Sequence, residues 1–351
     1  MAKQWTIKEI SRMAGVSPGT VDRVLHNRGN VSPEKLKRIE ETLKKAGYKY
    51  NLHTSAISLK KTYRIVVCTP ACAKGEYWHF ILSGIQKALD EFSDIQTDCS
   101  FSTYNQFDIY SCRNVYEDIL DNLPDAVILG PTFEKETQAF CKKLDKNNIP
   151  YVFVDSIVSD TRPTAAYTTD QPIGGQLMAK LLDGMTPKGS EMALFKAKRI
   201  SNLDSNNSLE RQKGFYNYLK EFGISVKEGF FSTFNTDENR EEMSRFLKRN
   251  PNVKAIAVMN SRGHIIADLL SEFGGKDIKV AAFDLTDSNR RCLSEGSIAF
   301  LLCQRPELQG FNAIKAAISA ILYKNKANSI IAMPIDIVMR ENLEYYKDFI
   351  I

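Results

Sequence analysis

The chain has no long hydrophobic run, no apolar signal core and no paired CxxC cysteines. Its richest apolar stretches, such as Ile65–Cys68 and Ala126–Leu129, have the length of a strand and fall far short of the roughly 20 residues that cross a bilayer. Seven cysteines, an odd number, favour a reducing compartment over a disulfide framework. These absences exclude a membrane protein and a secreted disulfide scaffold, and we expect a cytoplasmic protein.

The chain also lacks the sequence motifs of common enzymes. No GxGxxG follows the first apolar run, and neither a GxxxxGK[ST] loop nor a GxSxG elbow occurs. The four histidines are scattered without metal-ligand spacing, and Cys68 and Cys72 are interpreted as small buried hydrophobic residues. We therefore expect no enzymatic activity, no cofactor and no metal site.

Positive charge is concentrated at the N-terminal end of the 351 residues. Residues 1–61 contain 13 Lys and Arg against 5 Asp and Glu, a balance of +8, whereas the other 290 residues contain 34 against 37, a balance of −3. This asymmetry indicates a module that binds a polyanion, attached to a nearly neutral body. A solvated basic helix face is the alternative that charge alone leaves open.

Three short helices are predicted near the N-terminus. The first begins at a capping box formed by Thr6 and Glu9. The second begins at Ser17-Pro18, and the third begins at Ser32-Pro33 and ends at Gly47. The periodicity places these residues on the buried faces: Ile7, Ile10, Met13, Val21, Val24, Leu25, Leu36, Ile39 and Leu43.

The first two helices, joined by a turn that contains glycine, have the layout of a helix-turn-helix. Polar residues lie near the exposed face of the second helix: Ser17, Gly19, Thr20, Asp22, Arg23 and His26. The planar fork of Arg23 suits a guanine edge, whereas Ser17 and Thr20 suit phosphates. The alternative is a generic three-helix bundle in which Arg23 is a surface ion-pair partner.

The residues Thr6–Ser17, Thr20–Leu25 and Val31-Ser32 closely resemble the DNA-binding head of the LacI/GalR repressor family, and the resemblance extends over essentially the whole chain. It implies binding to double-stranded operator DNA. Two departures stand out: Pro18-Gly19 occupies the two base-reading positions, and Asp22 stands where the family usually has serine. We interpret Asp22 as complementing the positive helix end rather than as accepting from cytosine. The expected DNA-binding residues are Thr6, Ser17, Pro18, Gly19, Thr20, Asp22, Arg23, His26 and Asn30, with Ile57 in the connector.

The resemblance also implies three parts: a helix-turn-helix domain over 1–49, a hinge over 50–62, and a two-lobed effector-binding and dimerisation domain over 63–351. In the family the hinge becomes a short helix in the minor groove and inserts an apolar wedge from each subunit. Counting eight residues back from Ile65 places Ile57 at the wedge position. A flexible linker is the other reading of this polar segment.

Short apolar runs alternate with helical stretches from Tyr63 onward. The expected strands are Ile65–Cys68, Ala126–Leu129, Tyr151–Val154, Met192–Phe195, Ala255–Met259 and Val280–Phe283. This order predicts an α/β body with doubly wound parallel sheets, and the restart of strands after Lys188-Gly189 predicts two lobes. The body resembles the periplasmic-binding-protein-like domain of the same family, in which Pro306–Tyr323 returns to the first lobe and Ile335–Ile351 to the second. The fold class is therefore a small all-α head followed by this two-lobed α/β body.

Polar residues follow three of these strands. Asp155, Asn260 and Asp284 come at or directly after strand ends, where open α/β sheets bind their ligands. Two carboxylates and an amide suit hydrogen bonds to neighbouring hydroxyl groups, and Tyr77 and Trp78 offer flat faces to a sugar. For any one of these residues, a helix cap, a turn former or a core aromatic is an equal alternative.

The family resemblance adds two members to this set. Positions that match Asp155, Arg211, Asn260, Asp284 and Gln304 line the cleft between the lobes in the family, and Tyr77 and Trp78 resemble the sugar-stacking pair of ribose-type binders. The expected function is a homodimeric transcriptional regulator whose operator affinity responds to a small effector, a sugar or sugar derivative. A dimer is favoured over a tetramer because no leucine heptads follow the last strand. The alternatives are a transporter's solute-binding protein and an α/β enzyme with a DNA-binding appendage.

Overall fold

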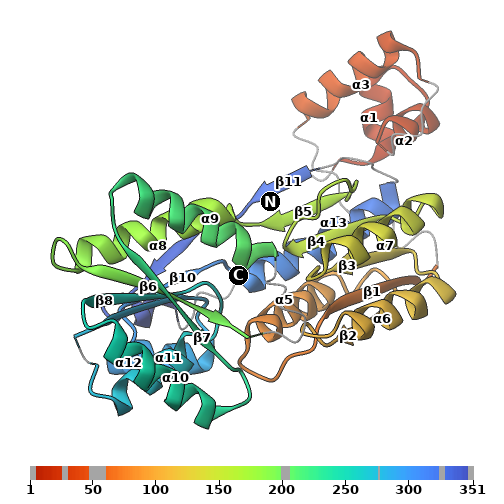
Figure 1. Cartoon of the computed structure of the whole chain (residues 1–351). Helices are drawn as coiled ribbons and strands as arrows, with labels where there is room; N and C mark the ends of the chain where they lie inside the picture. The colour runs from red at the N-terminus through yellow and green to blue at the C-terminus, as the bar shows by residue number, and fades with distance from the viewer. Residues whose placement is uncertain are drawn as a thin grey trace.

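The computed structural model describes residues 5–25, 31–46, 61–198, 206–275, 277–323 and 329–346, which form a three-helix unit and two α/β lobes (Figure 1). This arrangement confirms the predicted fold class. All seven cysteines are free thiols. Within the described ranges, no helix is both long and apolar enough to cross a membrane.

The three-helix unit consists of α1 (Ile7–Ala14), α2 (Pro18–Leu25) and α3 (Pro33–Lys45). The predicted capping box is confirmed, because the Thr6 hydroxyl accepts from the Glu9 amide at 3.3 Å and the Glu9 carboxylate accepts from the Thr6 amide at 2.9 Å. The Ser17 hydroxyl accepts from the Thr20 amide at 3.2 Å and so caps α2 as predicted. Arg38 of α3 donates to the Ala14 carbonyl at 2.8 Å, which ties α3 to the end of α1.

The core of this unit is smaller than the sequence pattern predicts. Ile10, Val21 and Ile39 are fully buried. Met13 and Leu36, both expected inside, are instead 50% and 37% exposed. The helices are so short that only the side chains nearest their common contact are covered. The side chain of Leu25 lies outside the described residues.

The first lobe is a six-stranded sheet with helices on both faces. Its strands are β1 (Tyr63–Pro70), β2 (Thr97–Tyr104), β3 (Ala126–Leu129), β4 (Tyr151–Asp155), β5 (Ala165–Thr168) and β11 (Ser329–Ala332), in the order β11-β5-β4-β3-β1-β2. All neighbouring strands are parallel. Its helices are α5 (Tyr77–Glu91), α6 (Ile109–Asp121), α7 (Glu134–Lys146) and α13 (Pro306–Tyr323).

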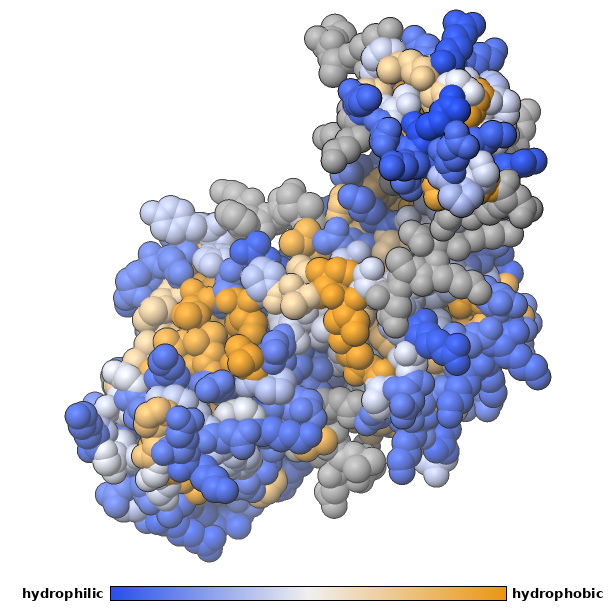
Figure 2. Space-filling view, turned by 90° about the horizontal axis from the view of Figure 1, so that it is seen from above, coloured by the Kyte–Doolittle hydropathy of each residue, from blue (hydrophilic) through white to orange (hydrophobic). Residues whose placement is uncertain are grey.

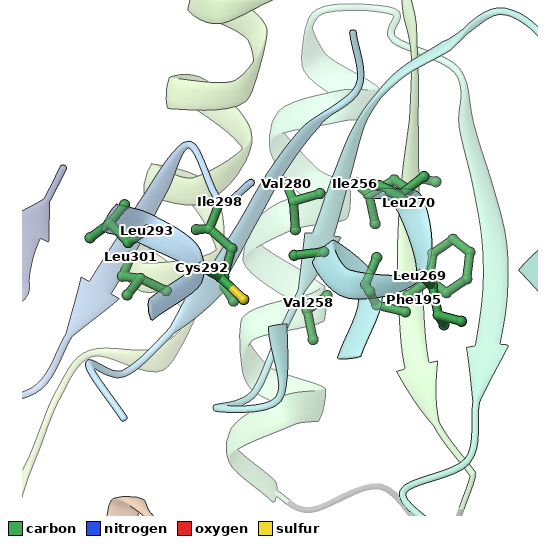
Figure 3. Packing of buried hydrophobic residues seen from close by; sticks show 14 of the residues in the cluster. Phe195, Ile256, Val258, Leu269, Leu270, Val280, Cys292, Leu293, Ile298 and Leu301 are labelled. Atoms are coloured by element: carbon green, nitrogen blue, oxygen red, sulfur yellow. The ribbon is translucent and has the colours of Figure 1, made fainter. Parts of the chain in front are cut away.

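The second lobe repeats this design. Its strands are β6 (Glu191–Ala197), β7 (Val226–Phe231), β8 (Val253–Val258), β9 (Lys279–Phe283), β10 (Phe300–Cys303) and β12 (Asp336–Val338), in the order β12-β10-β9-β8-β6-β7. Only β12 runs antiparallel to its neighbour. The helical elements are α8 (Gln171–Met185), α9 (Asn206–Glu221), α10 (Thr236–Arg249), α11 (Gly263–Glu272), α12 (Asp287–Glu295) and the 3-10 turn η1 (Leu343–Tyr346). Figure 3 shows how Leu269 and Leu270 lie near Phe195 and Ile256 in its core.

The chain passes between the lobes three times, near residues 168–171, 303–306 and 332–336. The predicted return of Pro306–Tyr323 to the first lobe is confirmed, since α13 packs against α5 and β4. The predicted return to the second lobe is confirmed from Asp336 onward by the pairing of β12 with β10. The strands restart after Lys188-Gly189 as predicted, with β6 from Glu191, but the second lobe already includes the preceding helix, because α8 packs against α9 and β9. The first element of the second lobe is therefore a helix, so the positions of the strands alone do not show where this lobe begins.

Two helix pairs are packed through glycine, one pair in each lobe. A Cβ atom on Gly175 of α8 would lie 1.8 Å from the Arg211 carbonyl oxygen, and one on Gly214 of α9 would lie 1.8 Å from the Pro172 carbonyl oxygen. In the first lobe, a Cβ atom on Gly84 would lie 1.9 Å from the Glu307 carbonyl oxygen. The backbones therefore touch in both pairs, which fixes the starts of α9 and α13 beside the gap between the lobes.

Candidate functional site

Two buried aspartates end equivalent strands of the two sheets. Asp155 is the last residue of β4, the third strand from the β11 edge of the first sheet. Asp284 directly follows β9, the third strand from the β12 edge of the second sheet. Both residues have a left-handed backbone, with φ of 69° for Asp155 and 68° for Asp284. Aspartate tolerates this conformation better than most residues with a Cβ atom. The turn directs both carboxyl groups out of the strand ends and into the interlobe region.

Asp155 is bonded from both lobes. Its Oδ1 accepts from the Tyr77 hydroxyl of α5 at 2.8 Å, and its Oδ2 accepts from the Asn207 amide of α9 at 2.8 Å. The side-chain oxygen of Asn207, Oδ1, in turn accepts from the Ser156 hydroxyl at 2.6 Å. The side chain of Asn207 therefore links the start of α9 in the second lobe to the end of β4 in the first.

Asp284 belongs to a second chain of hydrogen bonds that includes Arg211. The Gln304 amide donates to the Asp284 carboxyl at 2.8 Å, and the Gln304 side-chain oxygen accepts from Arg211 Nη2 at 2.9 Å. Arg211 also donates to the Gln171 side chain at 2.6 Å and to the Met259 carbonyl at 2.9 Å. Its guanidinium carbon lies 3.8 Å from the centroid of the Phe283 ring. A single buried guanidinium is thus held rigidly beside two buried carboxyl groups.

Burial governs the protonation of these acids. Burial raises the pKa of Asp284 to about 7, although the Arg211 charge and the Gln304 hydrogen bond lower it and the Asp155 charge raises it further. Burial also raises the pKa of Asp155, against the opposing effects of Arg211, Tyr77 and Ser156. With its pKa raised toward neutrality, the Asp284 carboxyl can donate to a hydroxyl group when protonated and accept from one when ionised.

Tyr77 lines two cavities. The larger has a volume of about 350 Å³ and is also lined by Asp284 and Gln304. The smaller, of about 160 Å³, is lined by Trp78 and Asn260. Trp78 also packs in the core of the first lobe, and Asn260 accepts from the Arg262 amide at 3.0 Å.

The structure brings together most of the predicted effector-site residues, namely Tyr77, Asp155, Arg211, Asp284 and Gln304. Trp78 and Asn260 lie on the smaller cavity instead. Sequence reasoning missed several members of the network: Thr169, Gln171, Asn207, Asn289 and Gln309. Most of them lie in the first turn of a helix that follows a strand, or just before that turn. Polar residues at such positions are the sequence signal that could have identified them.

Asn289 holds the loop that carries Asp284. It is fully buried, and its amide nitrogen lies within 3.0 Å of the carbonyl oxygens of Ser261, Phe283 and Asp284. Its side-chain oxygen accepts from the His264 amide at 2.9 Å. Asn289 therefore joins the ends of β8 and β9 and positions the Asp284 carboxyl.

The lobes are in contact around the cleft. The Asp287 amide donates to the Gly75 carbonyl at 3.1 Å, and Arg262 lies 3.4 Å from the Glu76 carboxylate. The rings of Phe107 and Phe234, one from each lobe, have centroids 5.9 Å apart. These contacts close the gap between the lobes.

The three-helix unit presents the predicted DNA-binding residues on its surface, which is largely hydrophilic in Figure 2. Thr6, Ser17, Pro18, Gly19 and Arg23 are exposed. Thr20 and Asp22 are half-buried, and the hydroxyl groups of Ser17 and Thr20 are 2.8 Å apart. The other predicted residues, His26, Asn30 and Ile57, lie outside the described residues.

Comparison with known proteins matches both parts of the chain. The family "Bacterial regulatory proteins, lacI family" matches residues 6–51, and the family "Periplasmic binding protein domain" matches residues 65–325. The chain is 22% identical to the transcriptional regulator AscG of Escherichia coli K12 over 79% of its own length and 84% of the relative's. It is 24% identical to the ribose operon repressor of Lactococcus lactis over 80% of each chain.

Solved structures share the two-lobed fold. A crystal structure of a candidate LacI transcriptional regulator from Bacteroides fragilis has a TM-score of 0.77 at 28% identity, covering 82% of this chain and all of that one. A glucose-galactose binding protein from Geobacillus stearothermophilus has a TM-score of 0.70 at 22% identity, covering 81% of this chain and 99% of that one. The head match argues against a free solute-binding protein. The chain therefore belongs to the lacI family of bacterial regulatory proteins, and it is a DNA-binding transcriptional regulator with a periplasmic-binding-protein domain as its body.

Proposed function

We propose that the protein is a cytoplasmic homodimer that binds a near-palindromic operator, and that a sugar in the interlobe cleft changes its operator affinity. The observation that carries the proposal is the hydrogen-bond network between the lobes, in which Asp155, Arg211 and Asp284 are buried together. Paired carboxyl and guanidinium groups suit the neighbouring hydroxyl groups of a sugar. The names of two relatives, a ribose operon repressor and a glucose-galactose binding protein, support the same ligand class.

The network supports a route from ligand to DNA. Asn207 reaches across to Asp155, and Gln304 lies on a segment that passes between the lobes, so a ligand that replaces these bonds alters the balance between open and closed lobes. We propose that the domain covering 63–351 passes this change through the hinge over 50–62 to the head over 1–49. Allosteric couplings of this kind are typically about 1–3 kcal/mol.

Exposed aromatic residues on two sheet edges support a dimer. Phe101 on β2 and Phe230 on β7 are each 45% exposed, and each of these strands lies at one edge of its sheet. Unpaired edge strands with large apolar side chains are suited to association with another chain. We propose that these edges take part in the dimer contact, which sedimentation of the Phe101→Asp and Phe230→Asp variants would test by loss of the dimer.

The Asp284→Ala variant tests the effector site. A buried partner left without its acceptor costs about 1–3 kcal/mol per lost hydrogen bond, so effector affinity measured by calorimetry should fall at least about fivefold while operator binding persists. Asp118→Ala, which removes an exposed carboxyl from α6, is the matched control. An unchanged effector affinity in folded Asp284→Ala protein would show that the effector does not bind at Asp284.

A further inference from the structure

We propose that the effector is a neutral glycoside of at least two sugar rings, and that its second ring lies in the larger cavity between Arg290 and Glu307. This inference rests on the proposed function, because it assumes that a sugar binds in the cleft. It concerns residues that neither the sequence pattern nor the family resemblance assigned to the site.

The size of the larger cavity first indicates more than one ring. Its volume of about 350 Å³ lies within the range of about 300–1,000 Å³ that holds drug-sized ligands. The cavity extends beyond the Asp284 network, since residues of α12, α13 and η1 also line it. A single sugar ring bonded to Asp284 and Gln304 would leave the lining residues of α12, α13 and η1 without ligand contacts.

Besides Asp284 and Gln304, the cavity lining contains a second pair of polar residues, Arg290 and Glu307. The charges that act on Asp284 are those of Arg211 and Asp155. Burial raises the pKa of Glu307, and the charges that oppose this rise are those of Lys87, Arg290 and His79. Arg290 and Glu307 both line the larger cavity, and no hydrogen bond between them is present among the described residues.

Arg290 is poorly satisfied where it lies. Its Nη2 donates to the Tyr346 carbonyl at 3.3 Å, and its buried Nη1 has no hydrogen-bond partner among the described residues. A buried donor without an acceptor is unfavourable, and more so when it is charged. If the Arg290 side chain turns so that Nη1 enters the cavity, one hydroxyl group of a sugar ring can accept from it and the adjacent hydroxyl group can donate to Glu307.

The remaining walls of the cavity suit the apolar faces of a sugar. Phe80, Leu285 and Leu308 line the cavity, together with Tyr346. Aromatic and aliphatic side chains of this kind pack against the C–H faces of a pyranose ring, while its hydroxyl groups bond at the edges. Together with Arg290 and Glu307, these walls give the second ring both an apolar contact and a polar one.

The charges on the lining favour a neutral ligand. Arg305 is already neutralised by Asp336, through bonds of 2.8 Å and 2.9 Å. Arg290 then remains beside two acids, Glu307 and Asp284. The lining therefore has no surplus positive charge for a phosphate or a carboxylate, and an anionic sugar would approach two carboxyl groups.

Calorimetry on the full chain tests the inference with three groups of ligands: neutral monosaccharides, disaccharides built from them, and their phosphate esters. We expect one disaccharide to bind at least tenfold more tightly than either component. Glu307→Gln and Arg290→Met should each weaken that disaccharide at least tenfold and change monosaccharide affinity less than twofold. Arg291→Met is the matched control, because Arg291 is the next residue of α12 and pairs with Asp268 at 2.7 Å.

Three results would overturn the inference and leave the proposed function intact. They are a monosaccharide that binds as tightly as its disaccharides, a phosphate ester that binds most tightly, and an equal loss of both neutral ligand types in the Glu307→Gln variant. Thermal unfolding would confirm that each variant is folded. If no sugar binds to the parent protein, the proposed function and the inference both fail.

Discussion

Replacing Asp284 by asparagine should change how stability depends on pH. Asparagine keeps an oxygen for the Gln304 amide and tolerates the left-handed backbone at φ 68°, so the substitution removes the ionisable proton and little else. In the parent protein, burial raises the pKa of Asp284 from 3.8 to about 7. Between these values the folded state binds more protons than the unfolded state, so the free energy of unfolding falls as the pH rises.

The size of the effect follows from this rise. Each pKa unit corresponds to about 1.4 kcal/mol, so the buried carboxyl costs the parent protein about 4 kcal/mol above pH 7, of which about 3 kcal/mol develops between pH 5 and pH 8. Asp284→Asn should avoid this cost. Its stability relative to the parent should therefore increase by about 3 kcal/mol over that interval.

Urea unfolding followed by circular dichroism at pH 5, 6, 7 and 8 would measure the difference between the two proteins. Asp118→Asn removes an exposed carboxyl from α6 and controls for the change in net charge. A difference between Asp284→Asn and the parent that stays constant from pH 5 to pH 8 would refute the reasoning, since the Asp284 carboxyl would then titrate as it does in the unfolded chain.

Three further predictions concern packing and DNA. Gly175→Ala should destabilise the protein by about 1–3 kcal/mol, because its Cβ would lie 1.8 Å from the Arg211 carbonyl; Gly184→Ala, on the same helix with open space around it, should stabilise by about 0.5–1 kcal/mol, and thermal unfolding compares them. Arg23→Ala should cost about 1–3 kcal/mol on the operator and much less on random DNA in binding titrations, and equal losses would mean that Arg23 contacts only phosphate. Ile57→Gly should abolish the bend of circularly permuted operator fragments while Ile57→Leu keeps it, and an undiminished bend with glycine would contradict the wedge assignment.

The sequence predicted the centre of each sheet and missed the edges. The six expected strands correspond to β1, β3, β4, β6, β8 and β9. Most of these strands are apolar throughout, because helices cover both faces of each sheet. The edge strand β2, with the sequence TDCSFSTY, alternates exposed and partly buried residues and has no apolar run. The strand β12 contains only 3 residues, too few for a periodic signal, whereas β10, with the sequence FLLC, is as long and as apolar as the correctly predicted β3 and was overlooked.

The site was predictable where its residues end strands. Asp155 and Asp284 were found because each comes at the end of a buried strand, and Gln304 came from the family resemblance. Asn207 and Gln309 were not found, because each enters the network from a helix whose approach to the cleft depends on the packing of the whole lobe. No local pattern encodes the contact of Asn207 with a strand end about 50 residues earlier in the chain.

The pairing of α5 with α13 has a consequence for the order in which the protein folds during synthesis. The core of the first lobe includes Ala313, Ile314 and Ala317 of α13, and the glycine contact at Gly84 requires the same helix. More than 200 residues separate the end of α5 at Glu91 from the start of α13 at Pro306. At about 5–20 residues per second, the ribosome needs about 10–40 s to supply them. During that interval the face of the first sheet that α13 covers is exposed, whereas every helix of the head is made within the first 45 residues. The DNA-binding unit can therefore fold well before the lobe that controls it is complete.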